Sequence, residues 1–295
     1  MLCACSQKDY NPQLLAVEHI IEEHPDSALT LIEHIDTASL NSEADKALYG
    51  LLIVQARTKC DYTESDDSLI APAIDCFRER HDKQRLMKAL FYGATTAYNR
   101  RELNEAIVRG LESRDIAISL ADDYWRAKAA ELIADVFQKS FLYSEGLKYR
   151  KEAVEYYKLA GKERNHRFAI CDYIYDRYNN GDNGTQLTSV LDSITIIART
   201  EQTDSALLNY SISYTFLIYI DNHENAKAAQ LYDEFKTLIN RYPYVFDYVN
   251  CATLCVWLGD YDKAEEYLNA AEQIAEYNTD HAFIANCYSY FITVR

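Results

Sequence analysis

The sequence is poor in the residues that break helices. Its 295 residues include only 4 Pro and 8 Gly, and no Gly- or Ser-rich linker divides it. Proline removes a backbone N–H and glycine raises the entropic cost of ordering the chain, so a scarcity of both favours continuous helix. No stretch shows sustained alternation of apolar and polar residues, which is the pattern of a half-buried strand. We therefore expect an all-α protein without a sheet.

Positive charge is also scarce. The chain has 30 Lys and Arg against 46 Asp and Glu, a formal net charge of −16. Nucleic-acid binding takes much of its affinity from Lys and Arg on phosphates, and no basic stripe with interleaved aromatic residues is present. We expect no direct binding to nucleic acid. The acidity suits a solvated surface or a basic partner.

Patterns that carry catalysis or hold a cofactor are missing. There is no G-x-S-x-G, Walker-type or G-x-G-x-x-G motif. His19 and His24 are five residues apart, whereas two zinc ligands on one helix face need a spacing of four. Cys251 and Cys255 lie one helical turn apart, but no second pair completes a tetrahedral site. The sequence therefore predicts no enzyme, no cofactor and no metal site.

Long apolar runs are absent too, since no stretch reaches the ~18 residues that a membrane span requires. The first residues, Leu2-Cys3-Ala4-Cys5, nevertheless match the end of a bacterial lipoprotein signal, in which Cys5 would carry the lipid. The basic and apolar segments that precede such a site are missing. Either the start has been trimmed or the match is chance. The first reading makes residues 1–10 a signal remnant and tether; the second favours a cytoplasmic protein.

What the chain does contain is helical periodicity, which continues from residue 13 almost to the C-terminus. The periodic segments alternate with short turns and form pairs. They are 13–24, 24–35, 42–59, 64–82, 83–100, 102–122, 123–140, 143–161, 163–180, 185–200, 203–220, 224–242, 244–259, 261–277 and 279–294.

The turns between paired helices recur at a fixed spacing. The residue just inside each second helix is small in most cases. These positions are Ala106, Gly146, Gln186, Ala226 and Ala264, with intervals of forty residues and then a last one of 38. A period of this length with a helix–turn–helix unit is typical of stacked helical repeats, whose hairpins cannot bury their apolar faces alone. We predict a right-handed α-solenoid over residues 11–295, with about seven helix pairs and a terminal helix.

Residues 248–271 resemble the tetratricopeptide repeat (TPR). The first helix carries apolar and small residues at the expected places, Gly259-Asp260-Tyr261 forms the turn, and small or apolar residues line the second helix. The matching positions are Tyr248, Cys251, Ala252, Cys255, Ala264, Leu268 and Ala271. Residues 130–153 match less closely, through Ile133, Ala134, Phe137, Tyr143, Gly146 and Ala153. Residues 170–193 depart from the pattern at Ile174, Arg177 and Gln186.

The whole chain is also similar to a group of TPR lipoproteins common in Bacteroides-type bacteria. The similarity lies in LLAVEHIIEEHPDSALTLIEHID, in SEADKALYGLLIVQAR and in the NEAI turn, behind the lipoprotein-type Cys5. It implies a lipid-anchored protein of the cell envelope, on a periplasmic or outer-membrane face. Some similar proteins continue into a membrane helix, a coiled coil and a DNA-binding domain and act as sensory regulators, but this sequence has none of those segments.

In arrays of this family the first helix of each hairpin lines a concave groove. Rings grip apolar groups and amides hold a ligand backbone, so such side chains suit peptide binding. The alternative is that some of these rings pack between repeats. The predicted groove residues, mostly in the last turns of first helices, are Tyr98, Asn99, Asp135, Lys139, Tyr175, Tyr178, Asn179, Tyr219 and Trp257.

These patterns predict a non-enzymatic scaffold that binds a protein or peptide partner. The alternative is a sensory or regulatory TPR module that controls signalling or transcription through a partner chain. The last predicted helix, 279–294, has an apolar face with no later segment to cover it. This helix caps the array by folding back, or it dimerises, or the natural chain continues after it. We expect a homodimer or an apolar patch at this helix.

Overall fold

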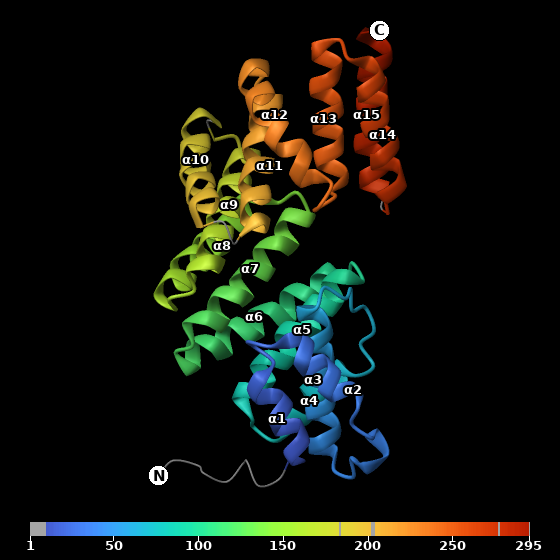
Figure 1. Cartoon of the computed structure of the whole chain (residues 1–295). Coiled ribbons are helices and arrows are strands. Elements are labelled where there is room, and N and C mark those ends of the chain that lie inside the picture. The colour runs from blue at the N-terminus through green and yellow to red at the C-terminus, as the bar shows by residue number, and fades with distance from the viewer. Residues whose placement is uncertain (1–9, 183, 202–203, 277, 295) are drawn as a thin grey trace. The chain divides into compact units, whose positions relative to one another are not determined.

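The computed structural model describes residues 10–182, 184–201, 204–276 and 278–294. This part of the chain forms fifteen α-helices and one short 3₁₀ helix, and no strand (Figure 1). The predicted all-α class and the TPR-like hairpins are confirmed. In the same residues, no helix is both long and apolar enough to cross a membrane. Cys5 and residues 1–9 of the tether predicted over residues 1–10 lie outside the described residues, so the lipidation site stays a prediction. Tyr10, the last residue of that segment, is described and buried.

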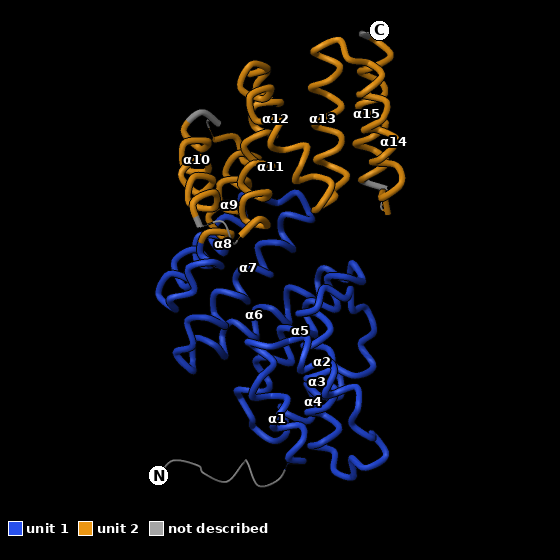
Figure 2. Tube along the Cα trace, viewed as in Figure 1, with its two compact units in different colours: residues 1–166 blue, residues 167–295 orange. Residues whose placement is uncertain are grey.

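The chain divides into two compact units, residues 1–166 and 167–295 (Figure 2). The border falls inside α9 (Glu163–Asn179). The sequence analysis predicted a single α-solenoid domain over residues 11–295, and this domain assignment stays a prediction.

Unit 1 is built from helix hairpins that pack in chain order (Figure 1). Its helices are α1 (Pro12–Ile20), α2 (Pro25–Glu33), η2 (Thr37–Ser39), α3 (Glu43–Lys59), α4 (Ile70–Glu79), α5 (Lys83–Asn99), α6 (Leu103–Leu120), α7 (Asp123–Lys139) and α8 (Tyr143–Leu159). The first helices also touch one another in the order α1, α3, α5, α7. They form one side of the unit, which we call the first-helix face of unit 1.

Unit 2 repeats this plan. After α9 come α10 (Gly184–Glu201), α11 (Ser205–Asp221), α12 (Asn225–Ile239), α13 (Val245–Leu258), α14 (Tyr261–Ile274) and α15 (Asn278–Val294). Helices α11, α13 and α15 touch in that order. We call the side that they form with α9 the first-helix face of unit 2.

Nine of the turns between the described helices share one backbone design. A residue with positive φ ends the helix, and the amide of the next residue bonds back five residues, as Asp260 does to the Cys255 carbonyl at 2.9 Å. This is the Schellman motif, which satisfies carbonyls at the end of a helix. The left-handed residues in the described chain are Asp61, His81, Arg101, Ala121, Phe141, Gly161, Gly181, His223 and Gly259. From Asp61 to Gly181 they recur every twenty residues. The spacing of these turn residues therefore defines the length of the helical repeat.

The Schellman turn corrects one part of the sequence-based repeat. Ala106, Gly146 and Ala264 lie five residues after a left-handed turn residue and are buried, as close helix crossing requires. Ala226 is exposed, and the equivalent buried residue is Ala228. The reason is that the turn after α11 falls at His223, two residues later than the twenty-residue spacing predicts.

The hairpin at 170–193 departs from the pattern in another way. Gln186 is exposed, and the neighbouring Leu187 is buried instead. The position after this turn therefore does not serve as a close-packed crossing.

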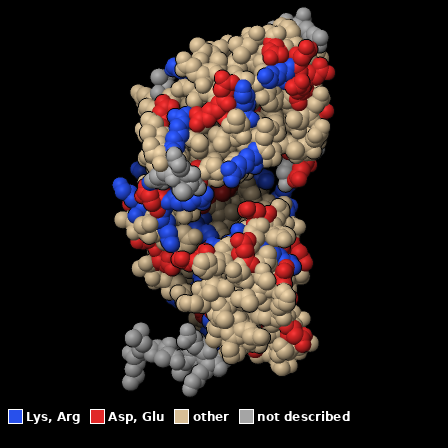
Figure 3. All heavy atoms as spheres, in the orientation of Figure 1, with Lys and Arg blue, Asp and Glu red and all other residues tan. Residues whose placement is uncertain are grey.

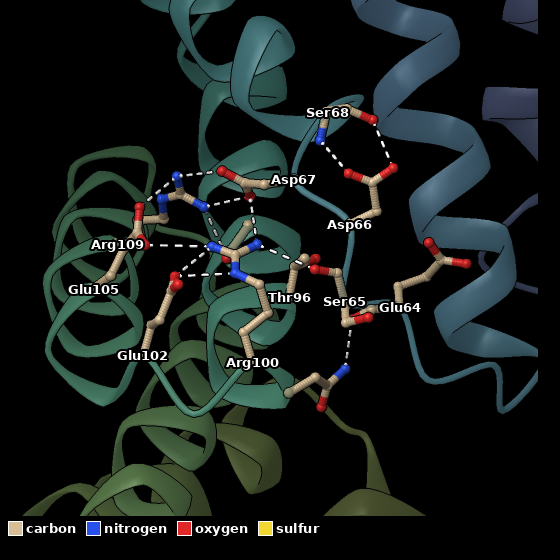
Figure 4. A network of polar contacts seen from close by, with 12 residues as sticks. Glu64, Ser65, Asp66, Asp67, Ser68, Thr96, Arg100, Glu102, Glu105 and Arg109 are labelled. Carbon is tan, nitrogen blue, oxygen red and sulfur yellow. Dashed lines mark hydrogen bonds and ion pairs between the residues drawn. The ribbon is translucent and has the colours of Figure 1, made fainter.

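The helix predicted over 64–82 starts later than expected, since α4 spans only Ile70–Glu79 and residues 64–69 precede it as a loop. The preceding loop is fixed by polar contacts to α5 and α6 (Figure 4). Arg109 holds the Asp67 carboxylate through two hydrogen bonds of 2.8 and 2.9 Å, and Arg100 donates to the Ser65 carbonyl at 3.3 Å. These contacts compete with helix formation at the loop.

The turn residues give a stability prediction. We expect Gly259→Ala to lower the free energy of unfolding by about 1 kcal/mol, because a side chain at φ +76° is strained. A Cβ built there meets nothing within 4 Å, so the effect is conformational. Ala121→Gly, at φ +53°, should stabilise by about 0.5–1 kcal/mol. Urea denaturation of both variants measures the difference, and a shift of the same sign in both would contradict the turn assignment.

Candidate functional site

The predicted groove residues of unit 1 are held by neighbours on the first-helix face. The Lys139 ammonium lies 4.4 Å from the centre of the Tyr98 ring. Asn99 donates from its side-chain amide to the Glu64 carbonyl at 2.8 Å and so fixes the loop before α4. The structure thus brings Tyr98 and Lys139 together and gives Asn99 a structural bond.

Asp135, the fourth predicted groove residue of unit 1, pairs with an arginine. Its carboxylate lies 2.7 Å from a guanidinium nitrogen of Arg150, whose side chain is fully buried. The same nitrogen donates to the Gln138 amide oxygen at 3.1 Å. Asp135 therefore links α7 to α8 as well as lying on the predicted surface.

In unit 2, two of the three predicted groove residues of α9 contact α11, one of them at its last residue, Asp221. The Tyr175 ring stacks on Tyr214 with centres 4.7 Å apart. The Tyr178 hydroxyl donates to Asp221 at 3.4 Å, and burial, followed by that carboxylate, raises the pKa of Tyr178 to about 12. Asn179 donates to the Tyr175 carbonyl at 2.8 Å, a bond within its own helix.

The two remaining predicted residues lie on α11 and α13. Lys227 places its ammonium 5.2 Å from the Tyr219 ring centre. The Trp257 indole N–H donates to the Tyr290 hydroxyl of α15 at 2.8 Å. Each predicted aromatic residue of unit 2 therefore has a partner from a neighbouring helix, and their role in binding stays a prediction.

A charged cluster that the sequence did not reveal lies deeper on the first-helix face of unit 1. At its centre the Lys128 ammonium is surrounded by four aromatic rings. The distances from the nitrogen to the ring centres are 4.6 Å for Phe91, 4.6 Å for Trp125, 5.5 Å for Tyr92 and 5.6 Å for Tyr124. Burial among these rings lowers the pKa of Lys128 to about 8.

The same cluster contains two more lysines and one carboxylate. Lys88 lies 5.7 Å from the Trp125 ring centre. Glu22 lies in the turn that follows α1. Its carboxylate contacts the Lys59 ammonium at 3.0 Å and accepts a hydrogen bond from the Gln55 side-chain amide at 2.7 Å. Burial would raise the pKa of Glu22, but Lys128 and Lys59 outweigh it and the pKa is lowered. We call this set the lysine site: Glu22, Gln55, Lys59, Lys88, Phe91, Tyr92, Tyr124, Trp125 and Lys128.

Two buried polar atoms of the lysine site lack a hydrogen-bond partner in the described chain. They are the Tyr92 hydroxyl and the Gln55 side-chain oxygen, and both residues are at most 1% exposed. Buried polar atoms are almost always satisfied, so unsatisfied ones call for an explanation. Within the described residues, Lys88 and Lys128 also make no ion pair.

The arginines of unit 1 show the contrast, because carboxylates hold them closely. Arg85 contacts Glu18 at 2.7 Å, and Arg114 contacts Glu152 at 2.8 Å. On the face of the molecule in Figure 3, basic and acidic side chains likewise lie next to one another. Lys128 differs from these arginines because it is buried among rings and makes no ion pair in the described part of the chain.

Unit 2 has a second polar group on its first-helix face. Asp247, buried on α13, accepts a hydrogen bond from Ser213 of α11. Asn209 lies one turn before Ser213, and Asn250 one turn after Asp247. The Asn209 amide oxygen and the Asn250 amide nitrogen are buried without a partner in the described residues. One free acceptor and one free donor are what an extended peptide backbone can satisfy.

The buried carboxylate of this group gives a prediction for pH. Burial raises the pKa of Asp247 to about 6, despite the bond from Ser213. The folded state then binds the proton more tightly than the unfolded state. The destabilisation caused by burying the ionised carboxylate is therefore absent below pH ~4 and complete above pH ~6. We expect Asp247→Asn to stabilise the protein by about 1–2 kcal/mol at pH 7. Thermal unfolding at pH 4.5 and 7 tests this, and an equal gain at both pH values would contradict it.

Sequence reasoning missed the lysine site because it placed the groove mainly in the last turns of the first helices. Lys88 and Lys128 are the sixth residues of α5 and α7. They are forty residues apart, the same interval as that between Ala106 and Gly146. Extending the repeat to charged residues would have found this pair. The ring cage around Lys128 depends on packing and was not visible.

Metal-ligating groups and thiols are the other side chains with possible chemistry. In the described part of the chain, no group of three or more His, Cys, Asp or Glu side chains could hold a metal ion. Cys171, Cys251, Cys255 and Cys287 are free and buried. Burial raises the pKa of Cys251 well above its usual value, which disfavours the reactive thiolate.

No protein-family model and no curated protein matches the sequence. Solved structures do match the fold. NprR in complex with its cognate peptide NprX has a TM-score of 0.68 and 15% identity, covering 95% of this chain and 82% of that chain. The apo form of RapI has a TM-score of 0.64 at 13% identity, covering 95% and 86%. A Rap protein complexed with Competence and Sporulation Factor has a TM-score of 0.57 at 12% identity, covering 96% and 98%. The chain therefore has the fold of TPR-like α-solenoids.

Proposed function

We propose that this chain is a non-enzymatic scaffold that binds a peptide or an extended protein segment on its first-helix faces. The observation that carries the proposal is the set of unsatisfied buried side-chain groups on those faces. Tyr92 and Gln55 in unit 1, and Asn209 and Asn250 in unit 2, lack partners within the described chain. The fold likeness supports the same function, because NprR was solved with its cognate peptide.

A random heptapeptide library tests the proposal, with binding to the purified chain measured by fluorescence anisotropy. Selected peptides should protect amides of the first helices from hydrogen exchange. Replacing Tyr178 and Trp257 together by alanine should weaken binding at least tenfold if the predicted residues of unit 2 take part. A matched control is Tyr244→Ala, which removes a ring that is 63% exposed at the start of α13. Unchanged binding by the double variant would remove these two residues from the site.

We also propose that the natural protein is anchored in the cell envelope by a lipid on Cys5. The resemblance to TPR lipoproteins supports this location. Intact mass and membrane fractionation, after expression in the native host with the native upstream sequence, test it. A mature chain that starts at Cys5 with added acyl mass is expected. A soluble chain that retains Met1 would make the match at Leu2–Cys5 a coincidence.

A regulatory role is the second candidate, in which peptide binding controls a partner chain. The observation in its favour is that two of the similar structures hold a cognate peptide or a named factor. Partner capture from the native host, with and without a selected peptide, separates the two roles. Release or recruitment of a partner by the peptide favours regulation, and capture that ignores the peptide favours a scaffold.

The proposed partners include a second copy of the chain at α15. Its inner face is buried through Ile284, Cys287 and Phe291. On the outer side Phe283 is 39% exposed and Ile292 is 74% exposed. Sedimentation equilibrium tests dimerisation, with Ile292→Glu as the variant. A monomer at all concentrations would rule out this interface.

A further inference from the structure

We propose that the lysine site of unit 1 binds a carboxylate group of an acidic peptide ligand. The inference rests on the proposed peptide-binding function and adds the charge of the ligand. It also commits to one source, the acidic side chain of a peptide residue.

The first argument is local charge. Three lysines outnumber the two carboxylates that act on Lys128, Glu22 and Glu131, so the site is positive although the whole chain carries a net charge of −16. Glu131 accepts a hydrogen bond from the Tyr157 hydroxyl at 2.6 Å. Glu22 is engaged by Lys59 and Gln55. Lys88 and Lys128 have no carboxylate within ion-pair distance in the described residues and repel each other. An anion between them removes that repulsion.

The second argument is the environment of Lys128. Its ammonium has lost much of its hydration to four rings, and the ring faces replace only part of that interaction. Electrostatic attraction is stronger in such a poorly hydrated site than in bulk water. Burying the Lys128 ammonium destabilises the folded state, and an ion pair with a bound carboxylate would offset part of that destabilisation. Proton uptake should accompany binding near pH 8, since a carboxylate raises the pKa of Lys128 towards its usual value.

The third argument identifies a peptide rather than a phosphate. The Tyr92 hydroxyl can donate a hydrogen bond to a carboxylate oxygen, whereas the Gln55 oxygen needs a donor. A peptide supplies both, because its amide N–H groups lie beside its carboxylates. A phosphate monoester dianion offers no donor to the Gln55 oxygen, and Glu22 repels its double negative charge more strongly than the single charge of a carboxylate.

The test uses matched heptapeptide pools that carry either Glu or Gln at one fixed position, with anisotropy as the readout. The Glu pools should bind at least tenfold more tightly than the Gln pools. Lys128→Gln and Lys88→Gln should each reduce that ratio, and the double variant should bring it close to one. Lys151→Gln is the control, because it removes the same charge from an exposed position on α8. Circular dichroism and thermal unfolding of each variant confirm folding.

The outcomes separate this inference from the proposed function. Equal binding of Glu and Gln pools would overturn the carboxylate site and leave peptide binding intact. An unchanged Glu preference in the double lysine variant would move the anion site elsewhere. No binding by any pool would overturn both. Free glutarate that binds as tightly as the Glu pools would replace the peptide with a small dicarboxylate. Calorimetry at pH 8 in two buffers should show proton uptake in the wild type and not in Lys128→Gln.

Discussion

Replacing Asp135 by alanine is expected to lower the free energy of unfolding by about 2–4 kcal/mol. The Arg150 guanidinium is fully buried, and the Asp135 carboxylate lies 2.7 Å from one of its nitrogens. Removing one partner of a buried ion pair leaves the other charge poorly compensated, which costs about 3–5 kcal/mol when both are buried. Asp135 is 37% exposed, which reduces the expected loss. Urea denaturation with α7 and α8 followed by hydrogen exchange measures the change.

Two variants control this result. Asp135→Asn keeps an oxygen that can accept from Arg150 and should cost only about 1 kcal/mol. Combining Asp135→Ala with Arg150→Met removes both charges and should recover part of the stability, so a double-mutant cycle isolates their interaction. A stable Asp135→Ala that binds peptides tenfold more weakly would contradict the structural role. It would favour the groove role that the sequence predicted.

Much of the fold could be predicted from the sequence, because the helices carry regular apolar periodicity and their turns recur. The turn at Gly259-Asp260 was readable, since glycine adopts positive φ without strain and aspartate caps the next helix by accepting from the Lys263 amide. Other turns use Arg101, Phe141 or His223 at the same position. Those residue types give no local sign of a left-handed backbone. This explains why the two-residue shift at His223 escaped sequence analysis.

Errors arose where distant contacts decide the local structure. The segment before α4 has helix-compatible residues, yet Asp67 is held by Arg109 from α6. A contact between residues so far apart in the chain cannot be seen in a periodicity. The structure instead makes this segment a loop that packs beside the end of α5 through Asn99.

The candidate site was less predictable than the fold for a similar reason. The sequence located first helices and their last turns, and so named Tyr98, Trp257 and the other predicted groove residues. It could not show that Lys128 lies among four rings contributed by α5 and α7. It also could not show which polar atoms lack partners. Both properties follow from how neighbouring repeats pack, not from the order of residues in one helix.

Replacing Phe235 by alanine is the second large change, with an expected loss of about 3–5 kcal/mol in the free energy of unfolding of unit 2. Phe235 on α12 is fully buried, and its ring centre lies 4.8 Å from that of Phe216 on α11. Truncating such a side chain removes its transfer free energy and leaves a cavity. It also removes a direct aromatic contact.

The loss should concentrate on the helices that share this core. Each hairpin of a helical array is stabilised mainly by its neighbours, so an array responds locally to a defect. Hydrogen exchange of α11–α13 should quicken strongly in Phe235→Ala, while amides of α5 in unit 1 serve as an internal reference. Phe235→Leu keeps most of the volume and should cost only about 1–1.5 kcal/mol. If α5 loses protection as much as α12 does, the two compact units unfold as one cooperative block, and the local response expected of a repeat array does not hold for this chain.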